Sequence, residues 1–412
     1  HIQTDTRKLK SGELFFALKG ESFNGNLFAQ QALEKGAAAV VVDEETGVDS
    51  PLIFRVQDVL DTLQQLAKYH RLQLKIPVLA ITGSNGKTTT KELIHAVLSS
   101  QFKTSTTEGN LNNHIGIPLT LLKIPMDAEI AVVEMGANHQ QEIAGYCKYT
   151  LPTHGLINNV GKAHLEGFGG IEGVKKGKGE LYDFIRESNG TIFMNTDFEY
   201  LHEMSKGIEH VFTYGSSNAA ITGKIAENTP FLTVELTGFD SPALIHTRLV
   251  GDYNLPNVLA AVAVGTYFKV PFERIQKAIE AYIPSNSRSQ MIQKDGHHII
   301  LDAYNANPSS MKAAIENFSK LESTSKILML GAMAELGAES MHEHQEVINL
   351  IKKYNWKDVI LVGGDFLKLN PPFIVFEHAG QARDWFQMNV PPGSHILIKG
   401  SRSMKMELIL ED

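Results

Sequence analysis

Cysteine and long apolar runs are scarce in this sequence, and each scarcity excludes a class of protein. Cys147 is the only cysteine among 412 residues, so no intramolecular disulfide can form, which fits a reducing compartment. No apolar stretch approaches the roughly 20 residues that cross a membrane. No signal peptide is recognisable, although a segment preceding His1 would hide one. We therefore expect a cytoplasmic protein that does not insert into a membrane.

Positive charge is also limited. The formal net charge is −8 and is spread along the chain without a basic run, which argues against nucleic acid or an anionic membrane surface as the main partner. Hydrophobic residues make up 43% of the chain and charged residues 20%, as in ordinary globular proteins. A chain of 412 residues is too long for one core, so two or three domains are expected.

Strand and helix patterns divide the chain into three blocks. Residues 1–76 combine short strands rich in Phe and Val with one helical segment, which predicts a small α/β domain. Residues 77–284 alternate apolar strands with helices, which predicts a mainly parallel sheet covered on both faces, and residues 231–251 predict a β-hairpin appended to it. The strands expected in this block are 78–81, 130–134, 155–158 and 191–194. After a polar break at 283–290, residues 285–412 repeat the alternation and predict a Rossmann-like domain.

The stretch "VLAITGSNGKTTTKELIHAVL" is typical of a phosphate-binding loop between a strand and a helix. Gly83 and Gly86 let the backbone approach a phosphate, while successive N–H groups and the helix dipole favour an anion. Lys87 can reach the β- and γ-phosphates of a nucleotide, and Thr88 can ligate Mg²⁺. The full Walker spacing is absent, because Ile81 stands where the first Gly is expected. The alternative is an ordinary Gly-containing turn followed by an exposed lysine.

Two strand ends carry groups that can bind a cation. Glu134 ends the apolar strand of "IAVVEMGANHQQE", and a carboxylate beside a nucleotide can hold Mg²⁺. The alternative for Glu134 is a cap of the following helix. His164 in "NNVGKAHLEGFGG" can ligate a second cation or position a reacting oxygen, and the alternative is a solvated or hydrogen-bonded histidine.

Two further motifs have simple structural alternatives. Lys178 belongs to "KKGKGE", which by charge alone is a solvated helix face. Asn254 and Asn257 lie three residues apart ahead of an apolar helix, so both would face the same side of its first turn. Their amides can contact the edge of a base, or they can serve as helix N-caps.

In the last block, "DAYNANPSS" follows a strand and precedes a helix. A helix-capping turn explains its later residues but gives no reason for Tyr304 and Asn305. The "HEH" sequence, His342 to His344, hints at a metal site. Because histidines at i and i+2 of a helix point to different faces, we expect these residues on the surface.

Taken together, the motifs resemble the Mur ligase family, in family order and over almost the whole chain. The matching motifs are "TGSNGKTTT", "EMGANHQQEI", "NNVGKAHLEGFGG", "KGKGEL", "GDYNLPNVLAA", "DAYNANPSSM", "LGAMAELG" and "KGSRSMKME". Within the family, "YNANP" and the N-terminal "DTR" and "GELFFALKG" are similar to the member that adds D-alanyl-D-alanine. The resemblance implies three α/β domains: a small one that binds the UDP-muramoyl-peptide, a central one that binds ATP, and a C-terminal Rossmann-like one.

The activity implied by the resemblance is an ATP-dependent ligation in peptidoglycan precursor synthesis. A monomeric enzyme would join D-alanyl-D-alanine to UDP-N-acetylmuramoyl-tripeptide through an acyl phosphate, with Mg²⁺ at two sites. The third domain would swing onto the second around residues 283–290. The alternatives are a sister Mur or folylpolyglutamate-type ligase with another amine, a P-loop ATPase or kinase, and an inactive scaffold that binds sugar nucleotide.

The resemblance also assigns roles to individual residues, beginning with the ATP site. The nucleotide would be bound by Gly83, Ser84, Asn85, Gly86, Lys87, Thr88, Thr89, Asn254, Asn257, Arg288, Tyr304 and Asn305. One Mg²⁺ would be bound by Thr88 and Glu134, and a second by His164 and Lys178. Lys178 would be carbamylated, which requires a lysine with a lowered pKa. Lys87, His164 and Lys178 would be the catalytic residues.

Substrate contacts are implied in all three domains. Those beside the muramoyl-peptide would be Thr107, Asn110, Asn112 and Asn113. Those at the UDP-tripeptide end would be Asp5, Thr6, Arg7, Lys19 and Gly20. Those facing the incoming dipeptide or the closing interface would be Lys399, Ser401 and Arg402.

Overall fold

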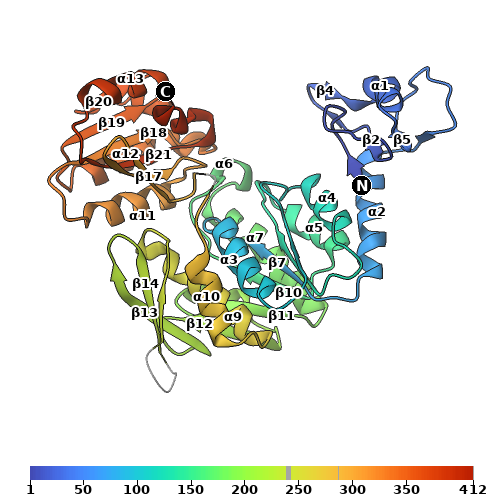
Figure 1. Ribbon diagram of the computed structural model, residues 1–412, viewed down its shortest axis with the longest axis horizontal. Coiled ribbons are helices and arrows are strands. Elements are labelled where there is room, and N and C mark those ends of the chain that lie inside the picture. The colour runs from blue at the N-terminus through green and yellow to red at the C-terminus, as the bar shows by residue number, and fades with distance from the viewer. Residues whose placement is uncertain (238–242, 286, 412) are drawn as a thin grey trace.

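The computed structural model describes residues 1–237, 243–285 and 287–411. Figure 1 shows three domains in chain order, with the N-terminal domain at one end of the molecule and the C-terminal domain at the other. The predicted α/β class with mainly parallel sheets is confirmed. Among the described residues, no helix combines the length and the apolar character needed to cross a membrane.

The N-terminal domain is a small parallel sheet with one short helix on one face and the start of a longer helix on the other. The sheet order is β1 (Ile2–Gln3), β2 (Leu14–Phe16), β5 (Ala39–Val42) and β6 (Ile53–Arg55). Helix α1 (Ala29–Glu34) lies within the segment that was expected to be helical, and it packs on this sheet. The strands β3 (Lys19–Gly20) and β4 (Phe23–Asn24) form a separate antiparallel pair.

Helix α2 (Val59–Gln73) joins this domain to the central one and was not expected from the sequence (Figure 1). It begins where the Asp58 side chain accepts a hydrogen bond from the backbone N–H of Asp61 at 2.7 Å. Val59, Leu63 and Ala67, spaced by four residues, form its buried stripe.

The central domain is built on a sheet with the order β15-β14-β13-β12-β11-β10-β7-β9-β8. Its strands are β7 (Val78–Thr82), β8 (Thr104–Thr106), β9 (Ile130–Glu134), β10 (His154–Ile157), β11 (Thr191–Asn195), β12 (His210–Gly215), β13 (Ile221–Asn228), β14 (Leu232–Thr237) and β15 (Ala243–His246). The four expected strands are confirmed. The expected β-hairpin corresponds to β14 and β15, its turn at 238–242 lies outside the described residues, and β13 adds a further antiparallel partner.

Both faces of this sheet are covered, because alternate residues of each strand point to opposite sides. Leu79 of β7 packs with α3 (Lys87–Ser99) and α9 (Leu255–Tyr267), whereas Ala80 packs with α5 (Glu142–Thr150) and α7 (Ile171–Glu187). The remaining helices of the domain are α4 (Gly116–Leu122), α6 (Leu165–Phe168), α8 (Glu199–Met204) and α10 (Phe272–Ala281). This packing fixes the carboxyl ends of the central strands at one edge.

The C-terminal domain has the expected Rossmann-like alternation. Its sheet order is β16 (Gln290–Lys294), β17 (His297–Asp302), β21 (His395–Lys399), β18 (Lys326–Gly331), β19 (Asp358–Val362) and β20 (Ile374–Phe376), parallel except for β16. The helices are α11 (Pro308–Ser319), α12 (Ser340–Ile351) and α13 (Ala379–Asn389). In the polar break expected at 283–290, residue 286 lies outside the described residues.

The prediction that the "HEH" residues lie on the surface is wrong for two of the three. His342 is exposed, but Glu343 and His344 are buried on the inner side of α12. Nε2 of His344 accepts a hydrogen bond from the backbone N–H of Met333 at 3.0 Å, and its Nδ1 lies 2.7 Å from the carbonyl oxygen of Ser340. His344 is therefore a hydrogen-bonded core residue that holds the loop after β18.

Candidate active site

One cleft of about 830 Å³ lies at the carboxyl ends of β7 and β9, between the central and C-terminal domains. It gathers predicted residues from motifs that are far apart in the sequence. Those that line it are Ser84, Asn85, Gly86, Lys87, Thr88, Thr89, Asn110, Asn112, Asn113, Glu134, His164, Asn254, Asn257, Arg288, Tyr304, Asn305 and Lys399. The predicted residues that do not line it are Gly83, Thr107, Lys178, Ser401 and Arg402, together with Asp5, Thr6, Arg7, Lys19 and Gly20 of the N-terminal domain.

The phosphate-binding loop turns sharply at Gly86, where φ is 77° and α3 begins. A Cβ at this position would lie 2.7 Å from Oδ1 of Asn257, so only glycine allows the loop to approach α9 this closely. Nζ of Lys87 donates hydrogen bonds to the carbonyl oxygens of Gly83 at 2.7 Å and Ser84 at 3.2 Å, and burial lowers its pKa. The lysine thus lies across the loop, where a phosphate would provide a stronger acceptor.

Glu134 and Thr88 form the acidic side of the cleft. Oγ1 of Thr88 donates to Oε1 of Glu134 at 3.2 Å, and Nδ2 of Asn112 donates to the same oxygen at 2.8 Å. The other oxygen, Oε2, is buried without a hydrogen-bond partner among the described residues. A hydroxyl and an unpaired carboxylate oxygen beside a phosphate-binding loop suit Mg²⁺, which prefers oxygen ligands.

Lys178 lies inside the central domain on α7 and is 1% exposed. Its Nζ donates to the carbonyl oxygen of Ala137 at 3.1 Å and lies 4.9 Å from the centre of the Phe168 ring. Burial, with the nearby charge of Lys87, brings the pKa of Lys178 well below its ordinary value. The alternative that Lys178 lies on a solvated helix face is therefore wrong.

Asn254 and Asn257 form a buried network with the phosphate-binding helix. Nδ2 of Asn257 donates to Oδ1 of Asn254 at 2.8 Å, and Oδ1 of Asn257 accepts from Oγ1 of Thr90 at 3.0 Å. Asn254 stands at the N-cap position of α9, but its side chain makes no capping hydrogen bond. The N-cap alternative therefore does not account for these two residues.

The C-terminal domain contributes an aromatic and basic wall. The guanidinium of Arg288 lies 3.6 Å from the centre of the Tyr304 ring, and Arg402 lies 5.4 Å from it. Nζ of Lys399, which is 2% exposed, binds Oδ2 of Asp302 at 2.5 Å. Of the remaining candidates here, Oδ1 of Asn305 accepts from its neighbour's N–H, and Oγ of buried Ser401 donates to the carbonyl oxygen of residue 332.

The substrate candidates outside the cleft have clear local contacts. Thr107 is fully buried, and its Oγ1 accepts a hydrogen bond from the backbone N–H of Glu134 at 3.0 Å. In the N-terminal domain, hydrogen bonds from Arg7 lower the pKa of Asp5 to about 2. Lys19, beside Gly20 in β3, forms an ion pair with Glu44, and Thr6 donates to a glutamine of α1.

A second group of contacts joins the two large domains at the rim of the cleft and was missed in the sequence. Nδ2 of Asn307 donates to Oδ1 of Asn85 at 2.7 Å, and Nζ of Lys162 binds Oε1 of Glu343 at 2.5 Å. The imidazole of His164 lies against the carboxylate of Glu335 and lowers the pKa of that carboxylate. The sequence signal that could have found Glu335 is the motif "GAMAELG" at a strand end, which contains it.

A glycine-rich loop between a strand and a helix, an acidic strand end and a second α/β domain across one cleft are the features expected of a nucleotide-dependent enzyme. The chain belongs to the Mur ligase family. Residues 1–76 match the Mur ligase family, catalytic domain, residues 81–265 the Mur ligase middle domain, and residues 287–402 the Mur ligase, glutamate ligase domain. The chain is therefore an ATP-dependent ligase that forms a peptide bond.

Similar proteins cover the chain from end to end. UDP-N-acetylmuramoyl-tripeptide–D-alanyl-D-alanine ligase of Bacillus subtilis strain 168 is 35% identical over 100% of this chain and 92% of its own length. The ligase of the same name from Escherichia coli strain K12 is 37% identical over 99% of this chain and 92% of its own. The MurF ligase of Thermotoga maritima, solved in complex with ADP, is 27% identical over 100% of this chain and 96% of its own, with a TM-score of 0.87.

Proposed function

We propose that this enzyme uses ATP to join D-alanyl-D-alanine to UDP-N-acetylmuramoyl-tripeptide, as the names of its relatives state for them. The observation that carries the proposal is the shared cleft. The phosphate-binding loop and Glu134 form one wall, and Arg288, Tyr304 and Lys399 form the other. A hydrolase or a switch needs only the first wall, whereas a ligase must bring a third reactant to an activated carboxylate away from water.

In the first half of the reaction, the peptide carboxylate is activated. One carboxylate oxygen attacks the γ-phosphorus of ATP in line, the bond to ADP breaks, and an acyl phosphate forms. The ammonium of Lys87 and the N–H groups at the start of α3 offset charge on the transferring group. Asn110, Asn112 and Asn113 stand beside Glu134 in the cleft, where they can hold the peptide.

The proposed reaction uses two cation sites. Thr88 and Glu134 would hold one Mg²⁺, because Oε2 of Glu134 is otherwise unpaired. His164 and a carbamate on Lys178 would hold the second. Mg²⁺ supplies positive charge to the phosphate oxygens and helps to align them. For the carbamate, the neutral Nζ of Lys178 attacks CO₂, a C–N bond forms, and a proton leaves to solvent.

In the second half, the free amine of D-alanyl-D-alanine attacks the acyl carbon. The C–O bond to phosphate breaks, the amine proton leaves to solvent, and a new amide and inorganic phosphate result. Closure of the C-terminal domain around residues 283–290 would exclude water and bring Tyr304 and Asn305 to the nucleotide. Asn254 and Asn257 would lie toward adenine, and Ser401 and Arg402 would lie near the closing interface. The candidates in the N-terminal domain would lie at the UDP end of the substrate; they are Asp5, Thr6, Arg7, Lys19 and Gly20.

We also propose that the enzyme works as a monomer in the cytoplasm, where ATP and nucleotide-linked precursors are available. The lone cysteine, Cys147, is buried, and burial raises its pKa, so it is an inert thiol. A sedimentation measurement on the purified full chain tests the monomer directly.

The test of function is phosphate release from ATP in the presence of Mg²⁺ and UDP-N-acetylmuramoyl-tripeptide, with and without D-alanyl-D-alanine. The proposal predicts that release depends on both substrates and that mass spectrometry finds the new amide. Release without any carboxylate substrate would favour an ATPase. Release that requires a different amine would indicate a sister ligase.

A further inference from the structure

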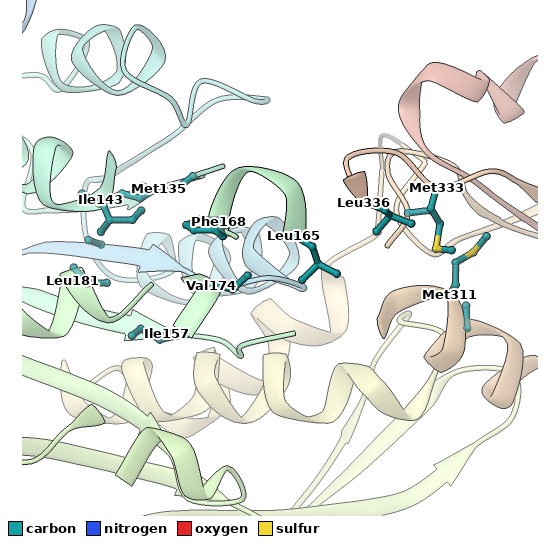
Figure 2. Close-up of a cluster of buried hydrophobic side chains, with 14 of the residues drawn as sticks. Met135, Ile143, Ile157, Leu165, Phe168, Val174, Leu181, Met311, Met333 and Leu336 are labelled. Carbon is teal, nitrogen blue, oxygen red and sulfur yellow. The ribbon is translucent and has the colours of Figure 1, made fainter. Parts of the chain in front are cut away.

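A loop of the C-terminal domain lies directly against the loop that carries His164. Leu336, after β18, and Leu165, at the start of α6, are both buried and belong to one hydrophobic cluster, and Figure 2 shows their side chains pointing toward each other. The backbone N–H of Glu166 donates to the carbonyl oxygen of Glu335 at 3.4 Å. This contact joins the two domains at His164 itself.

The imidazole of His164 is held by a carboxylate from the other domain. Oε2 of Glu335 lies against Nδ1 of His164, which has no hydrogen-bond partner of its own among the described residues, and His164 also lines the cleft. With Nδ1 turned to Glu335, Nε2 is the nitrogen left for the cleft. A carboxylate placed beside one ring nitrogen favours the tautomer with the proton on that nitrogen, so that the other nitrogen presents its lone pair.

We propose that Glu335 is a positioning residue, which fixes the His164 tautomer that presents Nε2 to the nucleotide cleft, and which does so only when the C-terminal domain lies on the central one. This inference rests on the proposed function, in which His164 serves the second cation. The carboxylate belongs to one domain and the imidazole to the other. Docking of the two domains therefore also sets the tautomer of His164.

The neighbouring contacts support this link between closure and His164. The backbone N–H of Lys162, two residues before His164, donates to Oγ of Ser309 at 3.1 Å, and its Nζ binds Glu343 at 2.5 Å. The segment that carries His164 is therefore held from the C-terminal domain on both sides. An open domain arrangement would release all of these contacts together.

The local structure gives no reason for Glu335 other than this contact. Its side chain is 50% exposed, so the hydrophobic core does not need it. Its φ is 62°, in the left-handed region that non-glycine residues seldom adopt. An exposed residue held in an unfavourable backbone conformation is common where a side chain must be presented at a functional site. Truncation of the side chain should therefore leave the fold intact.

The test uses the full chain with Glu335→Ala and Glu335→Gln, and with Glu339→Ala as the matched control. Glu339 is exposed four residues further along and makes no side-chain cap to α12. Gln keeps an acceptor oxygen for Nδ1–H, whereas Ala does not. The proposal predicts that Glu335→Ala lowers kcat by about 10- to 100-fold, as loss of such a partner typically does. Glu335→Gln should retain most of the activity, and Glu339→Ala should match the unmodified chain.

A second readout reports the tautomer without any turnover. Nitrogen-15 NMR of histidine-labelled protein, free of added metal and well above the ordinary His pKa of about 6.5, distinguishes protonated from unprotonated ring nitrogens. A His164→Gln variant identifies the signals. The proposal predicts protonated Nδ1 and unprotonated Nε2 in the unmodified chain and in Glu335→Gln, and a mixed or reversed state in Glu335→Ala.

The two readouts keep this inference separate from the proposed function. If the enzyme forms no amide, the kinetic comparison is lost but the NMR comparison still decides the role of Glu335. His164 signals that are unchanged in Glu335→Ala would overturn the inference, whatever happens to kcat. In a sample whose small-angle scattering matches the domain arrangement of the structure, the absence of a preferred His164 tautomer would overturn it as well.

Discussion

Replacement of Gly86 by alanine tests how the phosphate-binding loop is built, and its cost can be worked out from the structure. The backbone at Gly86 is left-handed, which costs an L-residue about 1–2 kcal/mol. The new Cβ would also lie 2.7 Å from Oδ1 of Asn257 and 3.0 Å from Nδ2 of Asn158. Displacing Asn257 breaks its bonds with Thr90 and Asn254, each worth about 1 kcal/mol. The sum is about 3–4 kcal/mol.

Gly169→Ala is the matched control, because Gly169 has a similar φ of 73° but no atom within 4 Å of the position of its Cβ. Only the backbone cost of about 1–2 kcal/mol remains there. Urea unfolding followed by tryptophan fluorescence and circular dichroism measures both variants, and calorimetric titration measures ADP binding. We expect Gly86→Ala to be the less stable of the two and to bind ADP about tenfold or more weakly, since the loop itself must shift.

Equal losses of stability in the two glycine variants, together with unchanged ADP binding by Gly86→Ala, would refute this reasoning. They would show that the close approach of the loop to Asn257 has no energetic consequence.

Three further changes test other parts of the account. Lys87→Ala should abolish turnover in the phosphate-release assay, because it removes the amine that lies across the loop; normal turnover would remove its role. Lys178→Ala should be largely inactive, and a short carboxylic acid, which can take the place of the carbamate, should restore part of the activity. Full activity without the acid would exclude the carbamate. Burial lowers the pKa of His154 to about 4, so the unfolded chain binds a proton more readily than the folded chain between about pH 6.5 and pH 4. Stability should therefore fall as the pH falls through this range, and His154→Phe should reduce that fall between about pH 7 and pH 5 in urea unfolding; an unchanged fall would contradict the assignment.

Much of the fold could be predicted because its signals are local. The strand β9 is an unbroken apolar run, and "GSNGKTTT" places a Gly-rich turn between a strand and a helix. Helix α2 was missed because many polar residues separate its apolar positions and because no glycine marks its C-terminal end in the sequence. Glu343 and His344 were placed on the surface because histidines two residues apart point to different faces of a helix. Their burial depends on Lys162 and Met333, partners that residue spacing does not identify.

Many of the residues that gather in the cleft were predictable to a similar degree. Lys87 and Glu134 stand in motifs whose chemistry is evident from a few neighbouring residues. By contrast, the burial that lowers the pKa of Lys178 comes from the packing of α6 on α7, and the pairing of Glu335 with His164 comes from the docking of two domains. Such contacts follow from tertiary structure and leave no periodic trace in the sequence.

The central claim is that ATP activates a carboxylate for attack by an amine. It is tested most directly with UDP-N-acetylmuramoyl-tripeptide whose terminal carboxylate carries oxygen-18, incubated with ATP, Mg²⁺ and D-alanyl-D-alanine. An acyl phosphate requires that each released phosphate takes one carboxylate oxygen with it, so the account predicts one oxygen-18 atom per phosphate and one new amide. Amide formation with unlabelled phosphate, or phosphate release with no amide, would contradict it.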